Sequence, residues 1–215
     1  MLKRLVFGLT ALMLCAAATG QTKPTEGKDY LTLNPPQTVE ANGKVDVTEF
    51  FWYRCPHCYN LEPVLQAWVK KLPRDVQFRQ VPAIFNDEWA LDARVFYMLD
   101  TTGDLARVHA GLMDAIHQQG GTRLKGDAYM KWVADWLGKN GVDLAKYDAA
   151  LRSFTVETKL KRATQLTQAY KIDGVPALSV QGRWLVSASM VGDRQAMINV
   201  TDFLTGEARK RLAAK

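Results

Sequence analysis

Hydrophobic and polar residues follow two different periods in the first half of the chain, and they predict a strand, a helix and a second strand. Val45 to Tyr53 is β-branched and aromatic, with apolar residues alternating on one face, which is typical of a strand. Pro63 should kink the following helix, Pro73 should end it, and Val76 to Val81 should form the next strand. The helix is predicted from apolar residues at helical spacing: Leu61, Val64, Leu65, Trp68, Val69 and Leu72.

The middle of the chain shows helical periodicity only, from Asp87 to about Tyr170. Strand character returns at residues 177–180, and Gln181-Gly182 should turn the chain into a hairpin with residues 183–186. A terminal helix is expected over residues 194–212, and a short strand over residues 30–33. This order predicts an α/β fold in which a helical insertion interrupts a small mixed sheet.

Composition limits the class of protein. The length of 215 residues fits one large domain, or one domain with an insertion. The composition, 47% hydrophobic and 23% charged, excludes fibrous, disordered and multi-span membrane proteins. The net charge is +6, but the basic residues are spread along the chain with acidic residues between them. We therefore expect solvated helix faces and no nucleic-acid partner.

The first 20 residues are typical of a secretory signal peptide. Lys3 and Arg4 precede an apolar run from Leu5 to Ala18, which small and polar residues follow. A lipoprotein signal at Cys15 would need a small residue before the cysteine, and Leu14 is there instead. We expect export to the periplasm, an oxidising compartment in which disulfides persist.

After removal of the leader, the only cysteines are those of Cys55-Pro56-His57-Cys58, between the predicted strand and helix. With Cys55 at the N-cap and Pro56 at the first helical position, the sulfur of Cys55 faces free backbone N–H groups and the positive end of the helix dipole. Both favour the thiolate, so the pKa of Cys55 should fall. Cys58 lies one turn on, within disulfide reach. We expect Cys55 to be an exposed nucleophile and Cys58 a buried resolving thiol.

His57 should stabilise the Cys55 thiolate further, as an imidazolium or as an N–H donor. Once the thiol pKa is below the ambient pH, each further unit stabilises the reduced form by roughly 30 mV of two-electron potential. The predicted pair is therefore oxidising.

A structural zinc site is the alternative for a Cys-x-x-Cys pair, but it needs two more ligands. The remaining histidines are His109 and His117, eight residues apart on a predicted helix, and we interpret them as solvated or capping residues. We expect no metal.

Two further residues are open to more than one interpretation. Glu49 is on the apolar face of the strand before Cys55. It is either an exposed or edge residue, or a buried acid of raised pKa that exchanges a proton with Cys58. Pro176 either opens a strand as punctuation or forms a cis peptide bond.

The sequence resembles the DsbA family of thiol:disulfide oxidoreductases, which belongs to the thioredoxin superfamily. The likeness covers nearly all of the chain after the leader. The residues that carry it are Gly27-Lys28-Asp29-Tyr30, Phe50-Phe51, Cys55-Pro56-His57-Cys58-Tyr59 and Gly174-Val175-Pro176-Ala177.

The resemblance implies a thioredoxin fold formed by residues 21–87 and 164–215, with an all-helical domain inserted at 88–163. It implies that Val175-Pro176 is cis and faces the disulfide, and that the backbone of Val175 pairs with an extended substrate. Glu49 would match the buried acid of the family. A quinone-linked membrane partner, DsbB, would reoxidise the cysteines.

We therefore expect a monomeric protein dithiol oxidase that donates its Cys55–Cys58 disulfide to reduced, newly exported polypeptides, with no cofactor besides that disulfide. Two alternatives remain. One is a disulfide isomerase or reductase of the same superfamily. The other is a periplasmic peptide-binding chaperone in which the cysteines are incidental.

Overall fold

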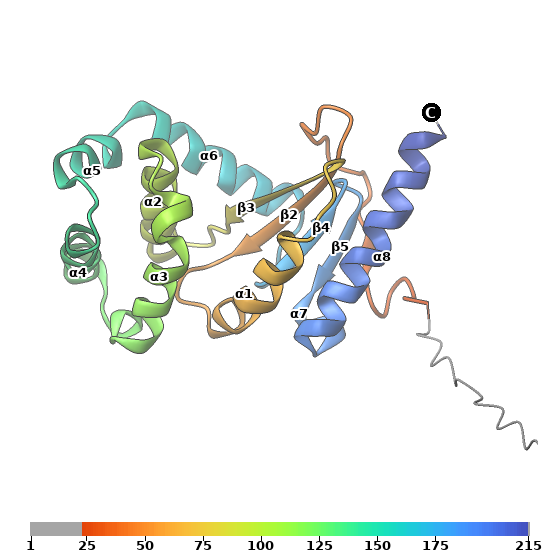
Figure 1. Ribbon diagram of the computed structural model, residues 1–215, viewed down its shortest axis with the longest axis horizontal. Helices are drawn as coiled ribbons and strands as arrows, with labels where there is room; N and C mark the ends of the chain where they lie inside the picture. Colours follow the sequence, from red (N-terminus) through yellow and green to blue (C-terminus); the bar gives the residue numbers. More distant parts are fainter. Residues whose placement is uncertain (1–22, 215) are drawn as a thin grey trace, which may run out of the picture.

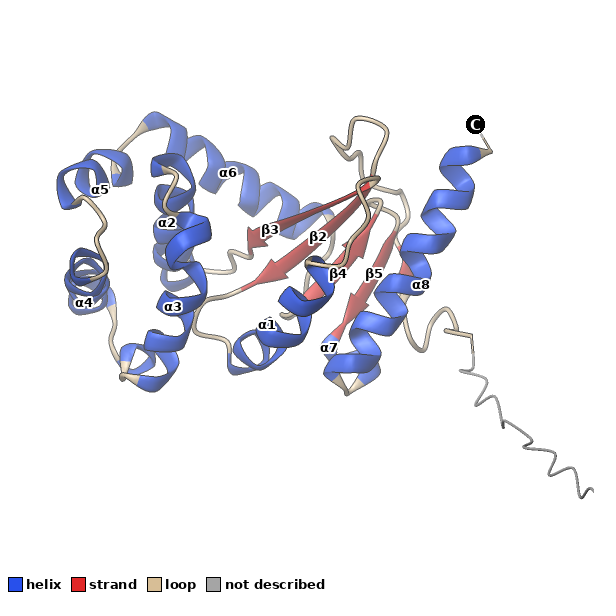
Figure 2. Ribbon diagram, in the orientation of Figure 1, coloured by secondary structure: helices blue, strands red, loops and turns tan. Residues whose placement is uncertain are grey.

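The computed structural model describes residues 23–214, and the predicted signal peptide lies outside them. At its centre is a mixed five-stranded sheet in the order β1-β5-β4-β2-β3 (Figures 1 and 2). The parallel pair is β2 and β3, and all other neighbours are antiparallel. The strands are β1 (Leu31–Thr32), β2 (Val45–Phe51), β3 (Val76–Pro82), β4 (Ala177–Val180) and β5 (Trp184–Ser187).

Helices form two groups around the sheet. Helix α1 (Pro56–Val69) and helix α8 (Arg194–Ala213) lie side by side across one face, with the short α7 (Ala188–Val191) at the start of α8 (Figure 1). The second group lies beyond β3, on the left of Figure 1. It comprises α2 (Asp87–Thr102), α3 (Leu105–Gln118), the 3-10 turn η1 (Gly121–Arg123), α4 (Gly126–Lys139), α5 (Leu144–Leu151) and α6 (Phe154–Ala169).

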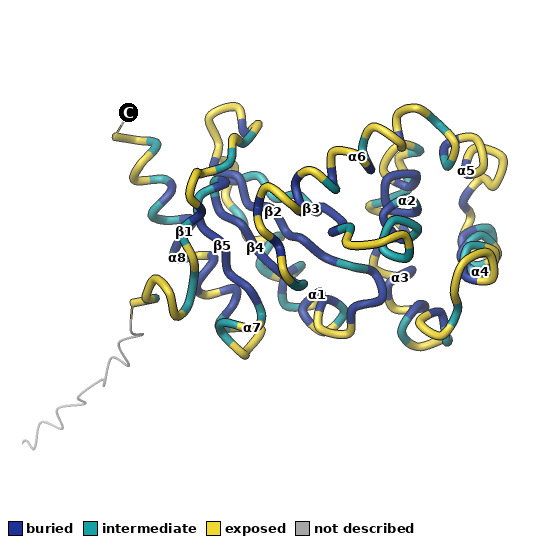
Figure 3. The backbone as a smooth tube through the Cα atoms, turned by 180° about the vertical axis from the view of Figure 1, so that it is seen from behind, coloured by how far each residue is buried: buried dark blue, intermediate teal, exposed yellow. Residues whose placement is uncertain are grey.

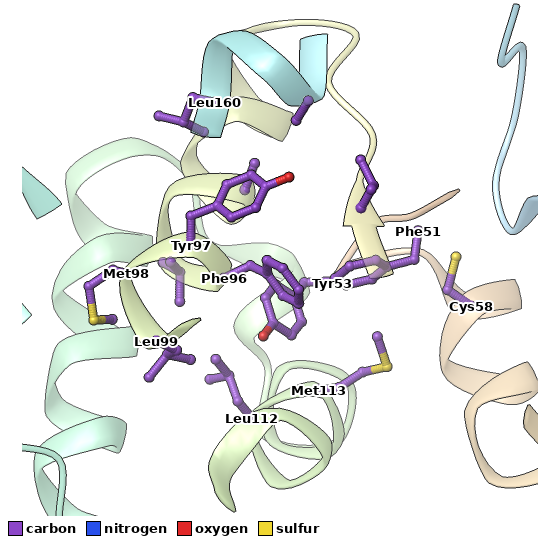
Figure 4. Close-up of a cluster of buried hydrophobic side chains, with 14 of the residues drawn as sticks. Phe51, Tyr53, Cys58, Phe96, Tyr97, Met98, Leu99, Leu112, Met113 and Leu160 are labelled. Carbon is purple, nitrogen blue, oxygen red and sulfur yellow. The ribbon is translucent and has the colours of Figure 1, made fainter. Parts of the chain in front are cut away.

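These two groups of helices give the protein two hydrophobic cores. The first joins the sheet to the helical group and includes Cys55, Cys58 and the aromatic residues drawn in Figure 4. The second fills the space between the sheet, α1 and α8. Every residue of β2 is buried, because this strand is central and covered on both faces (Figure 3).

The hairpin between β4 and β5 turns at Gln181-Gly182, as the sequence predicts. Both residues have positive φ (54° and 57°), as in the tight turns that join twisted strands. A Cβ atom on Gly182 would lie 2.1 Å from the carbonyl oxygen of Gln37, so this position requires glycine.

The α/β class and the thioredoxin fold with a helical insertion are confirmed. Most strand bounds shift by one or two residues from the sequence prediction, and β2 ends at Phe51, two residues early. In addition, α7 was not predicted, and α1 ends at Val69, before Pro73. Helix α1 continues through Pro63. The predicted domain boundary at residues 163–164 falls inside the continuous helix α6, and the domain division stays a prediction.

Among residues 23–214, no helix combines the length and the apolar character needed to cross a bilayer.

Candidate active site

The two cysteines lie where the chain leaves β2 and enters α1. Cys55 is the N-cap residue of α1, with extended backbone angles, and Pro56 begins the helix. The backbone N–H of Cys55 donates to the carbonyl of Trp52 at 3.0 Å, which closes the turn between the strand and the helix. Cys58 follows on the first turn of α1, and both cysteines are free thiols in this structure.

The pKa of Cys55 is lowered to about 6, as its position predicts. The largest cause is the hydrogen bond between the two cysteine side chains, in which the Cys58 thiol donates to the Cys55 thiolate. Burial opposes this effect, and the backbone N–H groups of Cys58 and His57 and the charge of His57 support it. Cys55 therefore carries a thiolate at neutral pH.

Cys58 has the opposite character. Its side chain is more deeply buried, and this burial raises its pKa well above the ordinary value of a thiol. The residue is 1% exposed, as expected of a resolving thiol, but Cys55 is only 6% exposed, so the expectation of an exposed Cys55 is wrong. The carbonyl of Val175 lies 3.5 Å from the Cys55 sulfur, while Pro56 and His57 are the exposed residues of the motif.

Glu49 is buried on β2, with 1% of its surface exposed, so it is not an exposed strand residue. The side-chain amide of Gln80, its register partner on β3, donates to Glu49 Oε2 at 2.8 Å. Burial, and to a lesser extent the nearby charge of Glu62, raise the pKa of Glu49 to about 8. The carboxyl is therefore protonated at neutral pH.

Sequence reasoning missed Glu62, which is buried on α1 and acts on Glu49 through its charge. A signal for it was available. Positions 55, 58 and 62 follow the three- and four-residue spacing of one helix face, so an acid at 62 was bound to lie on the cysteine side of α1.

His109 and His117 are not simply solvated or capping residues, which corrects the sequence interpretation. His109 is 6% exposed and pairs through Nδ1 with the Tyr53 hydroxyl at 2.9 Å, and burial lowers its pKa to about 4. His117 donates from Nε2 to the Tyr53 carbonyl at 2.9 Å and stacks on Tyr59. Both lie beside the active-site segment because α3 packs against α1, a contact that spacing within α3 does not reveal.

The loop before β4 faces the cysteines from the other side. The Val175–Pro176 peptide bond is cis, as the family resemblance implied. Next to it is a cavity of about 470 Å³. Its lining is mixed, with the apolar residues Leu61, Val175, Pro176, Ala188 and Met197 and polar residues that include His57, Asn60, Ser189 and Arg194.

In the described part of the chain, no group of three or more His, Cys, Asp and Glu side chains is arranged to hold a metal ion. A stabilised thiolate beside a protonated thiol can form, break and exchange disulfides. Together with the thioredoxin fold, this pair defines the class of thiol:disulfide oxidoreductases.

Comparison with known proteins identifies the family. Residues 46–204 match the family model described as DSBA-like thioredoxin domain. The chain is 35% identical over 214 residues to the thiol:disulfide interchange protein DsbA of Burkholderia cepacia, covering 98% of this chain and 99% of that protein. It is 34% identical over 211 residues to DsbA of Pseudomonas aeruginosa, covering 96% and 97%. The chain belongs to the DsbA family.

Solved structures agree with this assignment. The crystal structure of Pseudomonas aeruginosa DsbA matches with a TM-score of 0.82 at 34% identity, covering 89% of this chain and 97% of that one. The oxidoreductase NmDsbA1 of Neisseria meningitidis matches with a TM-score of 0.74 at 29% identity, covering 87% and 95%. The protein is a disulfide oxidase that works by thiol–disulfide exchange, which confirms the function and enzyme class predicted from the sequence.

Proposed function

We propose that Cys55 is the sulfur attacked by the substrate and that Cys58 is the leaving group. In the oxidised protein, a substrate thiolate attacks Cys55 Sγ, and the electron pair of the broken S–S bond passes to Cys58 Sγ. The substrate's second thiolate then attacks the substrate sulfur of the mixed disulfide. Cys55 leaves as a thiolate, and the substrate carries away a disulfide in exchange for two electrons.

Glu49 is the proton donor for Cys58 in this proposal. The released Cys58 thiolate is buried and strongly basic, while Glu49 holds a proton at neutral pH and interacts electrostatically with Cys58. Once protonated, the Cys58 thiol donates to Cys55. That bond makes Cys55 a better leaving group in the second step. His57 and Pro56 support the same thiolate from the exposed start of α1.

The substrate is proposed to be a reduced polypeptide bound in extended form beside Cys55. The backbone of Val175 would pair with its main chain, and the cavity next to Pro176 would take a side chain near its cysteine. Backbone pairing carries little sequence information, so we expect broad specificity. The cysteines, Glu49 and the cavity all belong to one chain, so a monomer suffices.

We further propose that the protein works in the periplasm on newly exported chains and is reoxidised by a DsbB-like quinone reductase in the membrane. Its DsbA relatives and the signal-like residues 1–20 support this proposal. No separate cofactor is required, because the disulfide is itself the electron acceptor.

The lowered pKa of Cys55 carries the proposal, since stabilising the reduced form makes the disulfide oxidising. This direction is already established for DsbA. The test is the equilibrium of the pair with glutathione. We expect an oxidising pair, and a potential near that of thioredoxin would point to a reductase instead.

The variant Cys55→Ser separates the oxidase from a chaperone. It should abolish oxidation of a reduced peptide containing two cysteines. If prevention of aggregation were the main activity, the variant would keep it unchanged.

A further inference from the structure

Residues 52–54, directly before Cys55, are bound by side chains to the helical group. The indole N–H of Trp52 donates to Asp92 of α2 at 2.5 Å, and the Trp52 ring stacks on Trp89 at 4.2 Å. The hydroxyl of Tyr53 pairs with His109 of α3. Residues 52 and 53 are therefore attached to α2 and α3 before the chain reaches the first cysteine.

Arg54, directly before Cys55, makes the most hydrogen bonds to the helical group of these three residues. Its Nε donates to Asp92 at 2.8 Å, and its Nη1 donates to the Glu88 carboxylate at 2.8 Å. Further bonds of 3.2 Å reach the main-chain carbonyls of Glu88 and Leu124. The guanidinium also lies over the Tyr129 ring, 4.4 Å from its centroid. It is thus held in one orientation by several independent contacts.

Burying the charged side chains of Arg54 and Asp92 costs free energy unless each has its partner of opposite charge. Arg54 and Asp92 are both buried, and burial raises the pKa of Asp92 while the charge of Arg54 opposes that rise. Removing one partner of a buried ion pair leaves an uncompensated charge. Residues 52–54 are therefore held rigidly, and the next residue is Cys55, whose sulfur reacts.

The Cys58 thiol is the largest stabiliser of the Cys55 thiolate, and the part that the backbone N–H groups add depends on this geometry. Cys55 is the N-cap of α1, and this position places its sulfur near the backbone N–H groups of His57 and Cys58, which favour the thiolate. That placement depends on the turn closed by the bond from Cys55 N–H to the Trp52 carbonyl. Hydrogen bonds weaken steeply when they are misaligned, so a small rotation of residues 52–54 would weaken the support of the thiolate.

We propose that Arg54 is a positioning residue for the disulfide exchange reaction. By holding the segment before Cys55 against α2, its guanidinium keeps the sulfur aligned with the N–H groups of α1. It acts through the backbone and not through its charge, which Asp92 and Glu88 neutralise.

The main test is Arg54→Gln in the full-length mature protein, with the Cys55 pKa read from the ultraviolet absorbance of its thiolate. We expect a rise of about one unit, and a shift of about tenfold in the equilibrium with glutathione toward the reducing side. Arg54→Lys keeps the charge but cannot span Asp92 and Glu88, so it should shift the pKa in the same direction. Full restoration by lysine would assign the effect to charge and overturn the proposal.

The matched control is Arg94→Gln. Arg94 is on α2 and binds the carbonyl of Leu151 and the carboxylate of Glu157, within the helical group and away from the cysteines. It should leave the Cys55 pKa unchanged. If Arg54→Gln instead lowers the unfolding free energy equally in the oxidised and reduced forms and leaves the pKa unchanged, Arg54 is only structural and the proposal is wrong.

Should Arg54→Gln fail to fold, Glu88→Gln provides the same test. Glu88 is partly exposed, and this variant loosens Arg54 without removing its bond to Asp92. A smaller rise in the Cys55 pKa is expected, and no rise would overturn the proposal. The inference rests on the proposed role of Cys55, but it can fail alone: the unsubstituted protein would remain oxidising while the Arg54 variants left the pKa unmoved.

Discussion

Two segments flank the sulfur of Cys55, and they differ in how they are held. Residues 52–54 are anchored by side chains: Trp52 and Arg54 bind Asp92, and Tyr53 binds His109. Gly174 and Val175 are only half-buried, Pro176 is buried, and the Val175 carbonyl lies 3.5 Å from the Cys55 sulfur. An added Cβ on Gly174 would meet no atom within 4 Å.

The difference corresponds to two tasks. A thiolate that is stabilised by aligned N–H groups needs a fixed position. A substrate that is bound through its backbone needs donors and acceptors that are still accessible. In the proposed function, the anchored segment serves the first task by fixing the position of the sulfur, and the open segment serves the second by leaving backbone groups for a substrate.

The largest expected effect concerns the sulfur between the two segments. Its thiolate exists only in the reduced protein, so reduced protein should be more stable than oxidised protein. The pKa of Cys55 is depressed to about 6 from an ordinary value of 9.0, so the stabilisation is absent below pH 6 and complete above pH 9. Between pH 6 and pH 9, the free energy of unfolding of the reduced form should increase by about 4 kcal/mol relative to that of the oxidised form.

Denaturant unfolding of both redox forms at several pH values measures this gain. Equal denaturation midpoints for the two forms across the window would contradict the mechanism.

A smaller effect on stability is expected from Glu49→Gln, on strand β2. The folded-state pKa is raised from 4.5 to about 8, so the neutral carboxyl stabilises the fold at low pH, and this contribution is lost as the pH rises through 8. The neutral amide should therefore be more stable than the native protein by about 3 kcal/mol at pH 7. Thermal unfolding against pH measures this difference. The exposed Glu40→Gln is the control, and parallel profiles for native protein and Glu49→Gln would argue against a titrating Glu49.

The smallest effect is expected on the Cys55 pKa from a change in residues 174–176. Val175→Asp places a carboxylate near the Cys55 sulfur, where like charge disfavours the thiolate and should raise its pKa by about one unit. Thiolate absorbance against pH measures the shift. The control is Val175→Asn, which has the same shape without the charge, and equal shifts in both variants would show that the loop acts through its shape. Because this segment is not anchored by buried ion pairs, stability should change little.

The local features of the site could be predicted from the sequence. A proline after a cysteine at a change of hydrophobic period indicates the start of a helix, so the character of both cysteines follows from their place on α1. Glu49 was ambiguous, because alternation gives a face of the strand but not what covers it. The cover comes from α1, and Glu62 is part of it.

Contacts across the helical group could not be predicted in this way. His109 and Arg54 are ordinary surface residue types, and each is buried by a partner many positions away. Periodicity locates the helices of the insertion but not their packing, so it places no residue of α2 or α3 beside the cysteines. The cis bond before Pro176 came from the family resemblance, since the residues themselves allowed either isomer.

The two edge strands of the sheet determine whether an extended polypeptide can add to it. An unpaired strand edge invites another extended polypeptide to add to it, and the proposed substrates are extended polypeptides. At one edge, β1 is only two residues long; at the other, β3 carries Arg79, tied to Asp46, and ends at Pro82. Both edges offer few free backbone groups for an added strand, so we expect little aggregation with extended polypeptides through the sheet edges, and the proposed substrate site at Val175 stays separate from them.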